Sequence, residues 1–234
     1  MTLVIRPILW ILTLLALGVL LSLGTWQVKR LAWKTDLIAK VEARIDLPPT
    51  PLTEVLETPD LEAQEYLPVI VSGGFPNARI AHVFGTHEGA AGYFAFAAMR
   101  LDDGSDRLVL VNRGFVPQDA LDTFYPLPDA GQLQGLIRLY TPEKGLAAQF
   151  APPNRPDDGI FFGRDPIALA RYLTPGEEDN YVAVAVDSTL PTTLPQGGTT
   201  LIDFRNAHLG YAITWYGLAA GLIGVVGALS LKRR

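Results

Sequence analysis

Three histidines are the side chains of this sequence best suited to bind a metal or move a proton. His82 and His87 stand five positions apart, a spacing that fits neither one face of a helix nor one face of a strand. We therefore expect them to be surface or satisfied histidines rather than a pair of metal ligands. His208 differs, because it is the last strongly polar residue before a long apolar run. Its imidazole would have one apolar side and one aqueous side.

Neutral imidazole is a good axial ligand for haem iron, which gives His208 a possible chemistry. On a helix, Tyr211 and Trp215 share the face of His208, three and seven positions further on. Together with the neighbouring Tyr216, these rings could flank a porphyrin. The same aromatic residues also suit an ordinary belt at the boundary of a bilayer. The residues alone leave both interpretations open.

Other catalytic patterns are missing from the sequence. No Gly-x-Ser-x-Gly motif is present, and the glycine-rich stretch at 85–92 lacks the lysine and hydroxyl of a phosphate-binding loop. The chain has no cysteine, so it has neither a thiolate metal site nor a cysteine nucleophile. We therefore expect a protein that is not an enzyme.

The apolar residues that must position His208 are concentrated at the two ends of the chain. Residues 8–28 and 209–231 carry no charge, and about 20 apolar residues are enough to span a bilayer core of about 30 Å. We predict one transmembrane helix over each range, with a soluble domain at 29–206 between them. The motifs Gly18-x-x-x-Ser22 and Gly217-x-x-x-Gly221 would let helices approach closely, either each other or those of a partner.

The distribution of charge gives an orientation. Two spans place both termini on one side, and Lys232, Arg233 and Arg234 directly follow the second run. This favours cytoplasmic termini and an exported domain. All 24 acidic residues lie between the runs, where they outnumber the basic residues, so we do not expect a nucleic acid partner. The chain opens almost directly on the first run, without room for a mitochondrial transit peptide, which favours the inner membrane of a bacterium.

The middle of the chain has mostly the pattern of β-strands. A helical pattern first continues the initial run over 29–44, and Thr50 can cap a short helix that begins at Pro51. Asp165 and Pro166 begin another helix, and a turn at 102–105 joins two strands in a hairpin. The predicted strands cover 66–71, 79–84, 93–101, 107–116, 132–140 and 181–187. The sequence predicts an α+β membrane protein, in which two transmembrane helices flank one domain rich in antiparallel sheet.

Four segments have distinctive sequences. They are G-T-W-Q-V-K-R-L-A-W-K (24–34), V-L-V-N-R-G-F-V-P (109–117), P-P-N-R-P-D-D-G-I-F-F-G-R-D (152–165) and N-A-H-L-G-Y-A-I-T-W-Y-G-L-A (206–219). In this order and with the two apolar runs, they make the chain resemble the Surfeit locus protein 1 family of cytochrome c oxidase assembly factors. The chain departs from that family at Phe115, often Trp there, and at Ala207, often a second Asn.

The resemblance implies a chaperone for haem-copper (aa3-type) cytochrome c oxidase, which promotes the insertion of haem a into subunit I. His208 would be the axial ligand of the haem iron, with Tyr211 and Trp215 beside the porphyrin. Haem A synthase would be a further partner, and membrane lipid would surround the two spans. The alternative is a structural scaffold that stabilises an oxidase assembly intermediate without binding haem.

Overall fold

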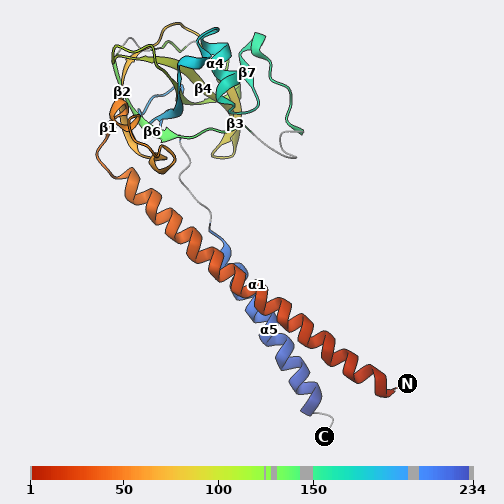
Figure 1. The fold of residues 1–234 in the computed structure, drawn as a ribbon. Helices are drawn as coiled ribbons and strands as arrows, with labels where there is room; N and C mark the ends of the chain where they lie inside the picture. Colours follow the sequence, from red (N-terminus) through yellow and green to blue (C-terminus); the bar gives the residue numbers. More distant parts are fainter. Residues whose placement is uncertain (1, 124, 128–130, 143–149, 200–205, 232–234) are drawn as a thin grey trace. The chain divides into compact units, whose positions relative to one another are not determined.

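A computed structural model describes residues 2–123, 125–127, 131–142, 150–199 and 206–231 (Figure 1). The chain forms two compact units. The helical unit combines both ends of the chain, Met1–Glu42 and Ile202–Arg234, and the sheet-rich unit is Ala43–Leu201.

The helical unit contains two long helices, α1 (Thr2–Ile45) and α5 (His208–Leu231). The predicted helical continuation of the first apolar run is confirmed, because α1 ends only shortly before the Pro48-Pro49 pair. Both helices are long and apolar enough to cross a membrane, over Pro7–Ile45 and His208–Ser230. Few residues of either apolar stretch are buried, so neither helix has the environment of a core helix in a globular domain.

The sheet-rich unit has eight strands in the part of the chain that the structure describes. The strands are β1 (Thr50–Pro51), β2 (Pro68–Gly74), β3 (Ala81–His87), β4 (Ala90–Leu101), β5 (Leu108–Pro117), β6 (Gly131–Arg138), β7 (Ile160–Phe161) and β8 (Tyr181–Ser188). The short helices are α2 (Leu52–Val55) and α4 (Pro166–Leu173), with single 3-10 turns at Glu62–Gln64, Gln118–Ala120, Pro156–Asp158 and Glu178–Asn180. All six predicted strands are present, each within three residues at either end.

Five of these strands close into a barrel, in the order β2, β6, β8, β5, β4 and back to β2. Closure occurs at Gly73, which pairs with Gly131 of β6 and also with Leu101 of β4. A Cβ atom at Gly73 would lie 2.0 Å from the carbonyl oxygen of Arg100. Only glycine therefore allows the two strands to approach closely enough to close the ring.

The prediction of an antiparallel sheet is wrong in part, because the sheet is mixed. The predicted hairpin of β4 and β5 is antiparallel, but β5 and β8 are parallel, as are β1 with β2 and β3 with β7. The reason lies in the number of strands. A closed ring of five strands cannot alternate direction all the way round, so at least one pair of neighbours must be parallel.

Side chains alternate between two apolar clusters along the barrel strands. Val109 and Val111 belong to a cluster with residues from all five barrel strands, which is the interior of the barrel. Leu110 belongs to the second cluster, on the outer face, where it packs with Leu169 and Leu173 of α4. Both faces of these strands are buried, one inside the barrel and one under α4. This explains why the strands are nearly continuous apolar runs in the sequence.

Two predicted helix starts have different outcomes. Asp165 accepts a hydrogen bond from the backbone N–H of Ile167, so the predicted cap of α4 is confirmed. The predicted cap by Thr50 is wrong, because α2 begins at Leu52 without a side-chain cap. Thr50 instead pairs with Val69 and lies in β1, so its backbone is part of the sheet.

Candidate functional site

His208 is the first residue of α5, and its side chain contacts α1 within the helical unit. Nδ1 of His208 lies 2.8 Å from Oε1 of Gln27. Gln27 is only 8% exposed, which is unusual for an uncharged amide on an otherwise exposed helix. This hydrogen bond joins two residues that are 181 positions apart in the sequence.

The contact determines which nitrogen of the imidazole carries the proton. The amide oxygen of Gln27 can only accept a hydrogen bond, so Nδ1–H of His208 donates to it. In the neutral ring, Nε2 then keeps its lone pair. Nε2 has no hydrogen-bonding partner among the described residues. His208 therefore has the protonation pattern of a histidine that binds a metal through Nε2, which is the donor that a haem iron would need.

The position of this pair follows from how the two helices pack. α1 and α5 lie side by side and antiparallel, because residues further along α5 contact earlier residues of α1 (Figure 1). The less exposed residues recur at alternating steps of three and four, which is the spacing of a coiled-coil seam. On α1 the residues with this spacing are Thr13, Leu17, Leu20, Gly24, Gln27 and Leu31, with Ala16 and Leu23 also less exposed beside them, and on α5 they are His208, Ala212, Trp215, Ala219, Leu222 and Val226. Gln27 and His208 are thus polar members of an otherwise mainly apolar seam.

A second polar contact lies nearby in the same helix pair. The hydroxyl of Thr25 donates to the backbone carbonyl of Leu21, so it must accept from the hydroxyl of Tyr216, at 3.1 Å. The ring of Tyr216 packs on Gly24. On the other side of His208, Asn206 donates to Thr35 at 3.4 Å. Hydrogen bonds between the helices therefore lie on both sides of the histidine.

The two aromatic residues predicted beside a porphyrin have different surroundings. Tyr211 is 57% exposed, whereas Trp215 is half-buried in the seam against α1. Within the described residues, no hydrogen bond or ring contact joins either side chain to His208. Their role beside a haem stays a prediction.

Sequence reasoning missed Gln27 as a partner of His208. The sequence shows Gln27 only as an amide at the end of an apolar run, three positions after Gly24, and this does not identify its partner. The small-residue motifs gave a different expectation for the pairing of the helices. A Cβ atom at Gly18, Gly217 or Gly221 would meet nothing within 4 Å, so α1 and α5 do not pair through these motifs. Pairing of these faces with a partner stays untested.

The remaining histidines lie in the sheet-rich unit. Nε2 of His82 is hydrogen-bonded to the hydroxyl of Tyr125, and the ring of His87 packs 5.4 Å from that of Phe115. Burial lowers the pKa of His82 and raises the pKa of Tyr125 to about 12. Both groups are therefore neutral near pH 7. Among the described residues, no three His, Cys, Asp or Glu side chains gather in a way that could hold a metal.

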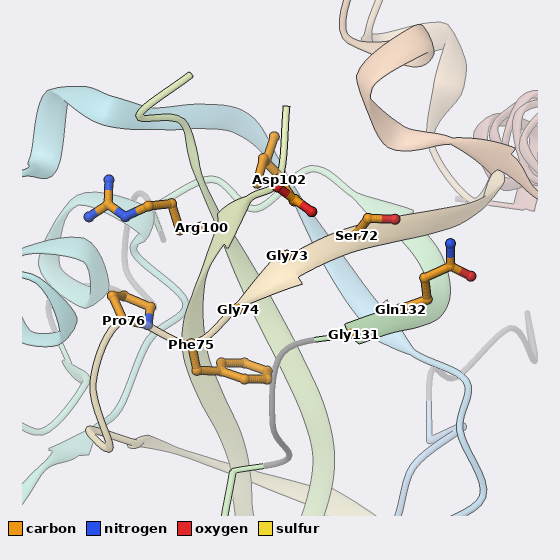
Figure 2. Close-up of a pocket in the computed structure, with 10 residues that line it drawn as sticks. Ser72, Gly73, Gly74, Phe75, Pro76, Arg100, Asp102, Gly131 and Gln132 are labelled. Carbon is orange, nitrogen blue, oxygen red and sulfur yellow. The ribbon is translucent and has the colours of Figure 1, made fainter. Parts of the chain in front are cut away.

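A hollow of about 700 Å³ lies where the barrel closes, beside Gly73 and Gly131 (Figure 2). Its charged side chains are Arg100 and Asp102. Arg100 is already paired with Glu177 at 2.5 Å and with Asp106 at 3.5 Å. Among the described residues that line the hollow, no hydrogen bond joins the hydroxyl of Ser72 to the carboxylate of Asp102, so His208 remains the better candidate for chemistry.

Comparisons with known proteins match a range of the chain that contains both Gln27 and His208. The model of the SURF1 family matches residues 14–220. The chain is 33% identical to Surfeit locus protein 1 of Homo sapiens over 229 residues, which cover 90% of this chain and 73% of the human protein. It is 32% identical to Surfeit locus protein 1 of Gallus gallus, over 85% of this chain and 67% of that protein. A SURF1-like protein of Caenorhabditis elegans is 31% identical, over 84% of this chain and 66% of that protein.

Proposed function

This chain belongs to the SURF1 family, and on that premise we propose that it is an assembly chaperone for haem-copper (aa3-type) cytochrome c oxidase. Its task would be to promote the insertion of haem a into subunit I. The observation that carries the proposal is the hydrogen bond from His208 to Gln27, which leaves Nε2 of His208 with a free lone pair. A histidine of this kind at one end of an apolar helix suits an apolar, iron-containing cargo.

In this proposal the haem is a cargo, and the protein only holds and releases it. Nε2 of His208 would be the axial ligand, and Tyr211 and Trp215 would lie beside the porphyrin. A single histidine ligand binds less tightly than the two histidines of a low-spin haem site, so the haem could pass on to the oxidase. Only the coordination bond between His208 and the iron would form and break, no covalent bond within the haem would change, and we propose no enzymatic activity.

We further propose that α1 and α5 cross a membrane, with residues 29–206 exported and both termini in the cytoplasm. The length and composition of the helices support this placement. The basic residues Lys232, Arg233 and Arg234 after α5 support the orientation. The partners would be oxidase subunit I, haem A synthase and the surrounding lipid. The inner membrane of a bacterium stays a prediction from the sequence.

The test is the visible absorption spectrum of the purified protein after co-expression with the enzymes of haem A synthesis. We compare the wild type with His208→Ala, and with His87→Ala as a matched histidine control. The wild type and the control should carry haem a, and His208→Ala, purified in equal amount, should not. Equal loading of all three proteins would mean that the ligand lies elsewhere. If none binds haem, the scaffold that stabilises an assembly intermediate becomes the better explanation.

A further inference from the structure

The side chain of Gln27 is buried and has a specific partner, but the proposed function gives this amide no role of its own. Its oxygen holds the proton of His208 on Nδ1. Which nitrogen of a histidine carries the proton is set by the hydrogen bond that the other nitrogen makes. In metal sites, the partner that accepts this proton also fixes the orientation of the ring and the basicity of the ligand.

We infer that Gln27 is a positioning residue, which holds the His208 ring in the Nδ1–H tautomer so that Nε2 is available to the haem iron. The inference rests on the proposed function, because it assigns a residue to the same site. Gln27 does not touch the iron in this arrangement, and it acts through His208 alone.

The helix pair gives Gln27 a fixed position. Its side chain lies in the seam between α1 and α5, one helical turn from Gly24, on which the ring of Tyr216 packs. The bond from Tyr216 to Thr25 and the bond from Asn206 to Thr35 lie on either side of His208. These contacts restrict sliding of the helices, so the amide oxygen stays opposite Nδ1.

The chemistry of the amide suits a haem that must be released. A carboxylate at position 27 would accept the same hydrogen bond, but it would draw the proton more strongly and make the imidazole a stronger ligand. A buried carboxylate would also carry a cost of desolvation that an amide avoids. The neutral acceptor orients His208 but increases its affinity for iron less than a carboxylate would.

The first experiment measures the tautomer directly, without haem. The full chain is labelled with ¹⁵N-histidine and studied in detergent micelles by NMR, and His208→Ala identifies the signal among the three histidines. The wild type should have Nδ1 protonated and Nε2 unprotonated at His208. Gln27→Leu, which keeps the volume but removes the acceptor, should move the proton toward Nε2. An unchanged tautomer in Gln27→Leu would overturn the inference.

Thr25→Val is the matched control for loosening of the helix pair. It removes the bond from Tyr216 and leaves Gln27 and His208 intact. Its His208 tautomer should match the wild type. If Thr25→Val shifted the proton as much as Gln27→Leu, general loosening of the helices would be the cause, and the specific role of Gln27 would be wrong.

The second experiment measures haem a binding and the reduction potential of the bound haem. Gln27→Leu should bind about 10- to 100-fold more weakly. Gln27→Glu should restore binding and lower the potential, a change that a purely structural role would not produce. If the wild type binds haem, and both variants keep its affinity and potential, the positioning role is wrong but the proposed function stands. If the wild type binds no haem while Gln27→Leu still shifts the tautomer, the proposed function fails and the assignment of the proton stands.

Discussion

The aromatic ring of Tyr216 rests on Gly24, and a Cβ atom at this glycine would lie 2.9 Å from Cε1 of the ring. That distance is shorter than normal contact between carbon atoms, so an alanine would force the ring to move. The hydroxyl of the same ring is hydrogen-bonded to Thr25. Movement of the ring would therefore disturb both contacts between α5 and this turn of α1.

We predict that Gly24→Ala destabilises the helical unit by about 1 kcal/mol, the usual contribution of one hydrogen bond. Gly18→Ala is the matched control, since a Cβ atom there meets nothing within 4 Å. It should be neutral or slightly stabilising, because alanine favours a helix more than glycine does. All four tryptophans lie in α1 or α5, so thermal unfolding followed by tryptophan fluorescence reports on this unit. Equal melting temperatures for the two variants would contradict the prediction.

Closure of the barrel at Gly73 gives a second prediction. The Cβ atom of Gly73→Ala would lie 2.0 Å from the carbonyl oxygen of Arg100, which is backbone and cannot rotate away. We expect a loss of about 1–3 kcal/mol in the free energy of unfolding, as for other overpacked sites. Urea denaturation of the full chain, followed by circular dichroism, measures this loss. Gly163→Ala should unfold like the wild type, since its Cβ atom meets nothing within 4 Å.

A buried hydrogen-bond network on the outer face of the barrel gives a third prediction. The hydroxyl of Tyr140 donates to Asp187 at 2.6 Å, and Nδ2 of Asn112 donates to the same oxygen at 3.0 Å. Tyr140→Phe removes one of these donors from a buried carboxyl group and should destabilise the unit by about 1–3 kcal/mol.

Tyr181→Phe is the matched comparison for this network. It removes a hydroxyl that is hydrogen-bonded to Thr174 at 2.9 Å. The expected loss is smaller, about 0.5–1.5 kcal/mol, because both groups are neutral hydroxyls. Urea denaturation of the two variants under identical conditions shows which one loses more free energy of unfolding. A larger loss in Tyr181→Phe than in Tyr140→Phe would contradict the prediction.

The half-buried imidazole of His82 predicts a dependence of stability on pH. Burial lowers the pKa of His82 below its usual value in the unfolded chain, about 6.5. Above that pH the ring is neutral in both states and its contribution to stability is complete. As the pH falls below about 6.5, the unfolded chain binds the proton first, so the free energy of unfolding decreases. In His82→Gln, the melting temperature should fall less between pH 7 and pH 5 than it does in the wild type. An equal fall in both proteins would contradict the prediction.

Local patterns predicted the elements of the fold well, and contacts between distant segments account for what was missed. A nearly continuous apolar run located β5, and Asp165 located the start of α4, because each signal lies within a few neighbouring residues. The ring of strands depends on the pairing of Gly73 with Leu101 and Gly131, which no local pattern specifies. Thr50 had the sequence of a helix cap, but its pairing with Val69 overrode that preference.

In the candidate site too, the residue marked by its neighbours in the sequence was predicted, and its distant contact was not. His208 was predicted from its place beside an apolar run and from the resemblance of the surrounding segment. Its partner Gln27 could not be predicted, because a hydrogen bond between the first and last helices depends on their rotation and register. The small-residue motifs left open whether the two helices pair with each other or with a partner, and the seam between α1 and α5 contains larger side chains with Gly24 at one close approach.

The helical unit is built from the first and the last segments of the chain, with the whole sheet-rich unit between them. A ribosome makes proteins from the N-terminus, so Gln27 is synthesised before the sheet-rich unit and His208 after it. A truncated product that ends after β8 would contain the barrel but would lack the histidine entirely. If His208 holds a cargo as proposed, this ability appears only once α5 has been made, after every strand of the barrel.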